Sequence, residues 1–138
     1  MMTSVPCLGV VVVVEDDEDT RELLKTVLQR RGYRVATAPD GLDGLDLLRT
    51  TDSVCFVLVD LFMPRMDGFG MLRAMTEDPN LAGLHVCLST SAPDAAPPGV
   101  ACLSKPIDLP QLFAMIELHC LTTAPLRAAN QTRSAQRA

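Results

Sequence analysis

The sequence predicts one α/β domain in which helices cover both faces of a parallel β-sheet. Three observations predict it. The length of 138 residues suits a single domain. Apolar strand-like runs alternate with segments of helical periodicity, and alternation of this kind is typical of a doubly wound sheet with right-handed crossovers. Residues 10–14 are five consecutive valines, as expected for a strand that is buried on both faces.

The first half of the chain contains three predicted strands and two predicted helices. The helix after the valine run starts among acidic residues, stops at Gly32 and has its apolar positions at Thr20, Leu23, Leu24, Val27 and Leu28. Residues 33–38 are less apolar, so we expect a strand near the sheet edge. The second helix has an apolar side made of Leu42, Leu45, Leu47 and Leu48. Residues 54–59 form another buried strand, which leads directly into Asp60.

The second half continues the alternation. A loop that contains Pro64 and Gly68 precedes a third helix, which runs to about Glu77. Strands are expected at 86–89 and 100–104. The last helix, at 109–120, has Leu109, Leu112, Phe113, Ile116 and Leu118 available for its inner face. Residues 1–121 therefore form the domain, and residues 122–138, which contain arginines and lack periodicity, are expected to be a disordered tail.

One helix of the alternating pattern is predicted to be missing. Only residues 91–99 separate the fourth and fifth strands, and they include Pro93, Pro97 and Pro98. A proline inside a helix costs about 3 kcal/mol, and average helices need ten or more residues. We therefore expect the fourth helix to be absent or reduced to a single turn near residues 94–96.

Composition limits the classes of partner. The net charge is −5, and the three arginines beyond residue 120 leave a body of charge −8, which argues against direct nucleic-acid binding. The apolar run at 8–14 is too short to span a membrane and lacks a preceding basic cluster, so neither a membrane partner nor a signal peptide is expected. The five cysteines are scattered without a C-x-x-C pair, which favours reduced thiols in a cytoplasmic protein.

Four predicted strand ends carry polar side chains. Glu15 and Asp16 follow the first strand, Asp60 the third, Thr90 closes the fourth and Lys105 the fifth. Ligands of open α/β sheets bind beyond the carboxyl ends of the strands, so these side chains are expected in one crevice. Two carboxylates about 4 Å apart repel by roughly 4 kcal/mol at an effective dielectric of 20. The crevice therefore needs a cation, and Mg²⁺ suits hard oxygen ligands.

A structural interpretation of the acidic run is also open. Asp16 and Asp17 could cap the helix that follows them, because acidic residues are favourable at a helix N-terminus. Capping leaves Asp60 and Lys105 unexplained. With a metal ion alongside, the Asp60 carboxylate could attack an incoming phosphoryl group, Lys105 could supply a positive charge and Thr90 a hydrogen bond.

Three motifs resemble the response-regulator receiver family of bacterial two-component systems. They are Val-Val-Glu-Asp-Asp-Glu-Asp-Thr-Arg-Glu-Leu-Leu at 13–24, Val-Asp-Leu-Phe-Met-Pro-Arg-Met-Asp-Gly-Phe at 59–69 and Ser-Lys-Pro at 104–106. The resemblance covers about residues 8–120. It implies the flavodoxin-like, five-stranded receiver fold, in this chain with its fourth helix shortened or absent.

The resemblance also implies roles for residues. Asp60 matches the phosphoacceptor, Glu15 and Asp16 the acidic pair, Thr90 the signalling hydroxyl and Lys105 the family's lysine. The implied Mg²⁺ site consists of the acidic pair and Asp60, with the backbone carbonyl of Phe62 as a further ligand. A cis peptide bond before Pro106 is implied as well.

The function implied by the family is transfer of a phosphoryl group from a histidine kinase or phosphotransfer protein to Asp60. The signal would then pass to a downstream protein partner, and no turnover of outside substrates is expected. The chain departs from the family at Cys102, where an aromatic residue is usual, and in its fourth helix. Our hypothesis is that the phosphorylation chemistry is kept while the output surface is rebuilt.

Two alternatives remain. The first is a pseudo-receiver, a protein-interaction module that signals without phosphate, which the lost helix favours and the complete set of polar residues disfavours. The second is a metal-dependent phosphatase with an aspartate nucleophile. Such enzymes carry a second aspartate two residues after the nucleophile, and the residue there is Phe62. Without that proton shuttle, steady turnover is not expected.

Overall fold

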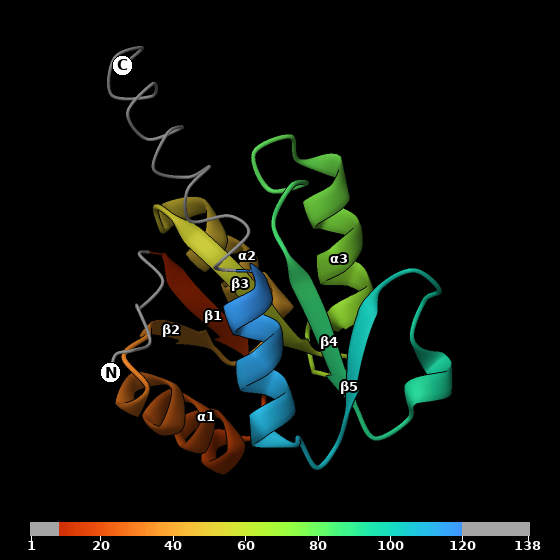
Figure 1. Ribbon diagram of the computed structural model, residues 1–138. Coiled ribbons are helices and arrows are strands. Elements are labelled where there is room, and N and C mark those ends of the chain that lie inside the picture. Colours follow the sequence, from red (N-terminus) through yellow and green to blue (C-terminus); the bar gives the residue numbers. More distant parts are fainter. Residues whose placement is uncertain (1–8, 120–138) are drawn as a thin grey trace, which may run out of the picture.

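A five-stranded parallel sheet with the order β2-β1-β3-β4-β5 forms the centre of the computed structural model, which describes residues 9–119 (Figure 1). The strands are β1 (Val10–Val14), β2 (Arg34–Ala38), β3 (Val54–Asp60), β4 (Val86–Thr90) and β5 (Ala101–Ser104). The helices are α1 (Glu18–Arg30), α2 (Gly41–Thr50), α3 (Gly68–Glu77), the single 3₁₀ turn η1 (Pro93–Ala95) and a helix over residues 109–119. The doubly wound flavodoxin-like fold is confirmed, and β2 lies at a sheet edge as predicted.

Helices cover both faces of the sheet, which explains the unbroken valine run. Val11 and Val13 belong to a core cluster with α1 and the helix over 109–119, whereas Val12 and Val14 belong to a second cluster with α2 and α3. All five valines of β1 are buried. Since successive side chains of a strand point to opposite faces, only a strand between two helical layers has this composition.

Aspartates begin the helices. The side chains of Asp17, Asp40, Asp67 and Asp108 each accept a hydrogen bond from the backbone N–H three residues later, at 2.8 to 3.0 Å. Such caps satisfy N–H groups that have no partner inside the helix. The capping interpretation of the acidic run is therefore correct for Asp17, whose carboxylate also accepts from the Thr20 hydroxyl at 2.6 Å, and leaves Asp16 free for another role.

The fourth helix is reduced to η1, which lies within one residue of the expected turn. The prediction of an inner helix face is wrong for three leucines. Leu23, Leu42 and Leu118 are 56%, 43% and 63% exposed. Each lies at the margin of its apolar stripe, where helical periodicity alone does not decide burial. Cys120 and the tail predicted at 122–138 lie outside the described residues. Within the described residues, no helix is long and apolar enough to cross a membrane.

Candidate functional site

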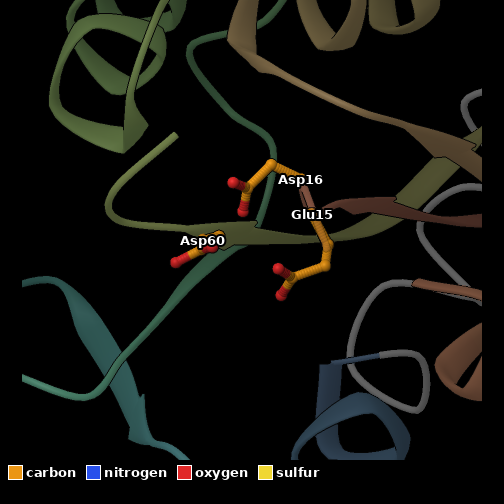
Figure 2. Close-up of side chains that lie close together, drawn as sticks. All are labelled: Glu15, Asp16 and Asp60. Atoms are coloured by element: carbon orange, nitrogen blue, oxygen red, sulfur yellow. The ribbon is translucent and has the colours of Figure 1, made fainter. Parts of the chain in front are cut away.

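The three acidic side chains predicted at the strand ends lie together at the carboxyl edge of the sheet. Parallel pairing of β1 with β3 sets Val14 opposite Val59, so that the residues after them are neighbours. Carboxylate oxygens of Glu15, Asp16 and Asp60 all lie within 4.8 Å of one another. Figure 2 shows the three carboxylates directed to the same side. A group of this kind provides hard oxygen ligands of the type that Mg²⁺ prefers.

Lys105 connects two of these carboxylates. Its Nζ lies 3.0 Å from Oε1 of Glu15 and 3.1 Å from Oδ2 of Asp60. Burial alone would lower the pKa of Lys105, but the hydrogen bonds and charges of the two carboxylates raise it above its ordinary value. The cis peptide bond between Lys105 and Pro106, which the family resemblance implied, is present. Sequence reasoning thus placed this lysine at the correct strand end.

The surroundings of Asp60 disfavour its ionised form even though Lys105 lies beside it. Its side chain is 7% exposed. Burial, followed by the charge of Glu15, raises the pKa of the Asp60 carboxyl to about 7, although Lys105 lowers it in part. Glu15 is also buried, whereas Asp16 is exposed. Three carboxylates and one ammonium group leave an excess of negative charge, so a divalent cation would stabilise the ionised site. The donor set therefore fits Mg²⁺.

Thr90 and Phe62 come from the same strand ends, because Thr90 follows Ser89, which pairs with Asp60, and Phe62 comes two residues after Asp60. Thr90 is 1% exposed, and its hydroxyl oxygen accepts a hydrogen bond from the Ala92 N–H at 3.0 Å. The hydroxyl hydrogen can still be donated to a ligand. Phe62 follows Asp60 in the loop to α3, and its N–H lies 3.4 Å from Oδ1 of Asp60. The carbonyl expected to bind the metal belongs to the same residue.

Sequence reasoning missed Arg21, an α1 residue that contacts the site. Its Nη1 donates to the backbone carbonyl of Glu15 at 2.8 Å. This bond ties the first turns of α1 to the residue from which the acidic pair begins. The available signal was the position of Arg21 one turn after the capping Asp17, which places a long cationic side chain close to the end of β1.

The chain is similar to known receiver proteins. A family model described as response regulator receiver domain matches residues 11–117. The chain is 36% identical over 119 residues to the response regulator MprA of Mycolicibacterium vanbaalenii, with 85% of this chain and 50% of that protein covered. It is 30% identical over 122 residues to an uncharacterised 14.6 kDa protein of Leptolyngbya boryana, with 83% and 92% covered. The chain thus spans about half the length of the MprA protein.

Solved structures of receiver domains are also similar to this chain. A response regulator receiver domain protein of Methanospirillum hungatei is 32% identical, with a TM-score of 0.69 and with 80% of this chain and 92% of that chain covered. The receiver domain of the Francisella response regulator 1452 has a TM-score of 0.73 at 21% identity, with 83% and 98% covered. The second likeness concerns the fold alone.

Proposed function

The chain belongs to the response regulator receiver family, and we propose that it is a phosphoacceptor receiver of a bacterial two-component or phosphorelay system. Asp60 would accept the phosphoryl group from a histidine kinase or phosphotransfer protein. Mg²⁺ would be held by Glu15, Asp16, Asp60 and the carbonyl of Phe62. The observation that carries the proposal is the contact of Lys105 with both Glu15 and Asp60 beside the third carboxylate.

The transfer is a displacement at phosphorus. A carboxylate oxygen of Asp60 forms a bond to phosphorus while the bond from phosphorus to the donor's imidazole nitrogen breaks, and the nitrogen keeps the electron pair. Lys105 would then leave the Asp60 oxygen for a phosphoryl oxygen, and the Thr90 hydroxyl would donate a hydrogen bond to another. Mg²⁺, when bound, supplies the positive charge that offsets the charge developing on the phosphoryl group.

We also propose where the phosphodonor protein docks. A hollow of about 230 Å³ between α1 and the segment after β5 is lined by Thr20, Leu23, Leu24, Lys105, Pro106, Ile107 and Leu109. It is mainly apolar and extends to Lys105, so a protein seated in it would reach the acceptor. Leu23 is 56% exposed at this place. The exposed part of Leu23 adds apolar surface to a hollow that is also lined by Lys105, the ion-pair partner of Asp60.

The output would pass to a downstream protein through the face where η1 replaces the usual fourth helix. We expect the protein to assist its own phosphorylation and dephosphorylation in the cytoplasm, without turnover of outside phosphate esters. Phe62 stands where a phosphatase of the aspartate-nucleophile kind has its acid/base residue, which supports this expectation. The reduced fourth helix is the observation that favours the alternative, a phosphate-independent pseudo-receiver.

The intact mass of the protein after incubation with Mg²⁺ and a small phosphodonor tests the proposal. The wild type should gain one phosphoryl adduct that depends on Mg²⁺, and Asp60→Asn should gain none. Asp52→Asn is a matched control, because Asp52 is an exposed aspartate that lies just before the start of β3, at the opposite end of that strand from Asp60. A folded wild type that binds Mg²⁺ but forms no adduct would favour the pseudo-receiver.

A further inference from the structure

The loop that joins Asp60 to α3 contains a tight turn centred on Arg65. The N–H of Met66 donates to the carbonyl of Pro64 at 2.7 Å, and Arg65 between them has φ +65°. A three-residue turn with a positive φ at its centre is a γ-turn of the rare, strained kind. Arginine is unfavourable in this left-handed region because its Cβ lies too close to the backbone. Something outside the turn must therefore hold it.

The N-terminus of α2 holds this turn. Arg65 forms a two-pronged ion pair with Asp40, with Nε 2.8 Å from Oδ2 and Nη2 3.1 Å from Oδ1. Nη2 also lies 2.9 Å from Oδ1 of Asp43. The carbonyl of Met66 accepts a hydrogen bond from the N–H of Gly41 at 2.9 Å. We call these four contacts the Arg65 clasp.

Two features at the N-terminus of α2 allow the clasp to form. Asp40 is 6% exposed, and its burial would raise the pKa of its carboxyl, but hydrogen bonds from Arg65 and from the Asp43 N–H hold that pKa below its ordinary value. A Cβ on Gly41 would lie 2.6 Å from the carbonyl oxygen of Met66, so a larger residue could not approach the loop as closely. The contact thus needs a buried carboxylate followed directly by glycine.

The clasp also restricts Phe62. Upstream of Phe62, the N–H of Leu61 donates to Ser89 of β4 and its carbonyl accepts from the N–H of Gly68, both at 2.8 Å. Downstream, only Met63 and Pro64 separate Phe62 from Arg65. Proline has a fixed φ, so few torsions remain free between the two held points. The clasp therefore limits the positions that the main chain of Phe62 can take.

We propose that Arg65 is a positioning residue for the metal site and acts by fixing the main-chain carbonyl of Phe62 through its ion pair with Asp40. This inference rests on the proposed function. Arg65 does not touch the reacting atoms. Its effect should appear in the Mg²⁺ concentration that phosphorylation requires, because the proposed function makes this carbonyl a ligand of the metal and not a contact of the phosphodonor.

The test compares Mg²⁺ binding, measured by calorimetric titration, with the rate of phosphorylation by a small phosphodonor at low and at saturating Mg²⁺. The variants are Arg65→Gln, Asp40→Asn and the double variant. Asparagine caps helices as well as aspartate does, so Asp40→Asn removes the charge and keeps the start of α2. Arg49→Gln is the matched control, because Arg49 lies at the other end of α2, pairs with Asp78 at 3.3 Å and is 49% exposed against 53% for Arg65.

We expect each single variant to bind Mg²⁺ about tenfold more weakly, the lower end of what removal of a supporting contact costs a metal site. Saturating Mg²⁺ should restore the rate. The double variant should bind Mg²⁺ no more weakly than Arg65→Gln alone, because Arg65→Gln already removes the ion pair with Asp40 together with the contact to Asp43. Arg49→Gln should bind Mg²⁺ like the wild type. Should Arg65→Gln fail to fold, Arg65→Asn replaces it, since asparagine tolerates a positive φ.

Other outcomes would overturn the inference. Variants that unfold more easily but bind Mg²⁺ as tightly as the wild type would show that the clasp has a structural role only. Additive losses in the double variant would show that the two residues act separately. If the wild type itself neither binds Mg²⁺ nor accepts a phosphoryl group, the proposed function fails and this inference fails with it. A normal wild type with unshifted variants overturns the inference alone.

Discussion

Replacement of Asp60 by asparagine should stabilise the metal-free protein, and more so at high pH. The Asp60 side chain is buried beside Glu15, and these two causes raise the pKa of its carboxyl to about 7 from 3.8. In the window between these values, the folded state holds a proton that the unfolded state has lost. Stability of the wild type must therefore fall as the pH rises through this window and level off above about pH 7.

The magnitude follows from the change in pKa. One pKa unit corresponds to about 1.36 kcal/mol, so ionisation of Asp60 costs the folded protein about 4 kcal/mol at pH 8. Part of this cost is already present at pH 5, because the unfolded carboxyl is largely ionised there. The advantage of Asp60→Asn over the wild type should accordingly grow by about 2 to 3 kcal/mol between pH 5 and pH 8.

Urea unfolding at both pH values, in the presence of a chelator, measures this difference. The slope with denaturant should be the same for both proteins, so that the midpoints report stability directly. The Asp52→Asn variant again serves as the control, because Asp52 is exposed. Addition of Mg²⁺ at pH 8 should then stabilise the wild type by mass action and leave Asp60→Asn nearly unchanged.

Two results would refute this reasoning. An advantage of Asp60→Asn that is the same at pH 5 and pH 8 would mean that the Asp60 carboxyl titrates normally in the folded protein. A less stable Asp60→Asn at pH 8 would mean that the ion pair with Lys105 outweighs the burial of Asp60 and the repulsion from Glu15. Either result would remove the electrostatic argument for a cation at this site.

Three further perturbations test the site and its surroundings. Lys105→Met should bind Mg²⁺ at least as tightly as the wild type, because a positive charge near the metal is removed. Intact-mass kinetics should show that its phosphorylation is slowed by about 100-fold, as expected for the loss of a group that stabilises developing charge. Thr90→Ala should leave Mg²⁺ affinity unchanged in calorimetry and slow phosphorylation by about tenfold, the effect of one hydrogen bond to a charged group. Gly68→Ala should lower the free energy of unfolding by about 1 to 3 kcal/mol, since its Cβ would lie 2.9 Å from the Asp60 carbonyl oxygen. Thermal unfolding checks this, with Gly83→Ala as the control that should be nearly unchanged, because a Cβ there meets nothing within 4 Å.

The strand ends could be predicted because two strong local signals coincide there. The runs before Glu15 and Asp60 are wholly apolar, and a change to carboxylates marks the point where each strand leaves the core. The reduced fourth helix was equally predictable, since proline excludes helix by covalent geometry. Both predictions rest on properties of neighbouring residues, and such properties are visible in sequence.

Other features depend on contacts between distant segments. The pair of Asp40 and Arg65 spans 25 residues, and no local pattern shows that a capping aspartate also binds an arginine of another loop. It was also open which of Asp16 and Asp17 caps α1 and which joins the carboxylate cluster, because both are aspartates and either position suits either role. The prediction that residues at the helix margins are buried failed for the same reason. Leu23 is an example, because its burial depends on which distant segment packs against that side of α1.

The reduced fourth helix leaves the site intact because strands and not that helix hold its parts. The N–H of Lys105 donates to the Thr90 carbonyl at 2.9 Å, which joins the ends of β4 and β5 directly. The Thr90 hydroxyl in turn accepts from the Ala92 N–H, and the Ala92 carbonyl accepts from the Ala95 N–H, both at 3.0 Å. Two hydrogen bonds therefore connect the hydroxyl to η1. Under the proposed function, a Thr90 hydroxyl that moves to meet a phosphoryl oxygen would shift its hydrogen bond with Ala92, and we therefore predict local ordering of residues 90–99 on phosphorylation.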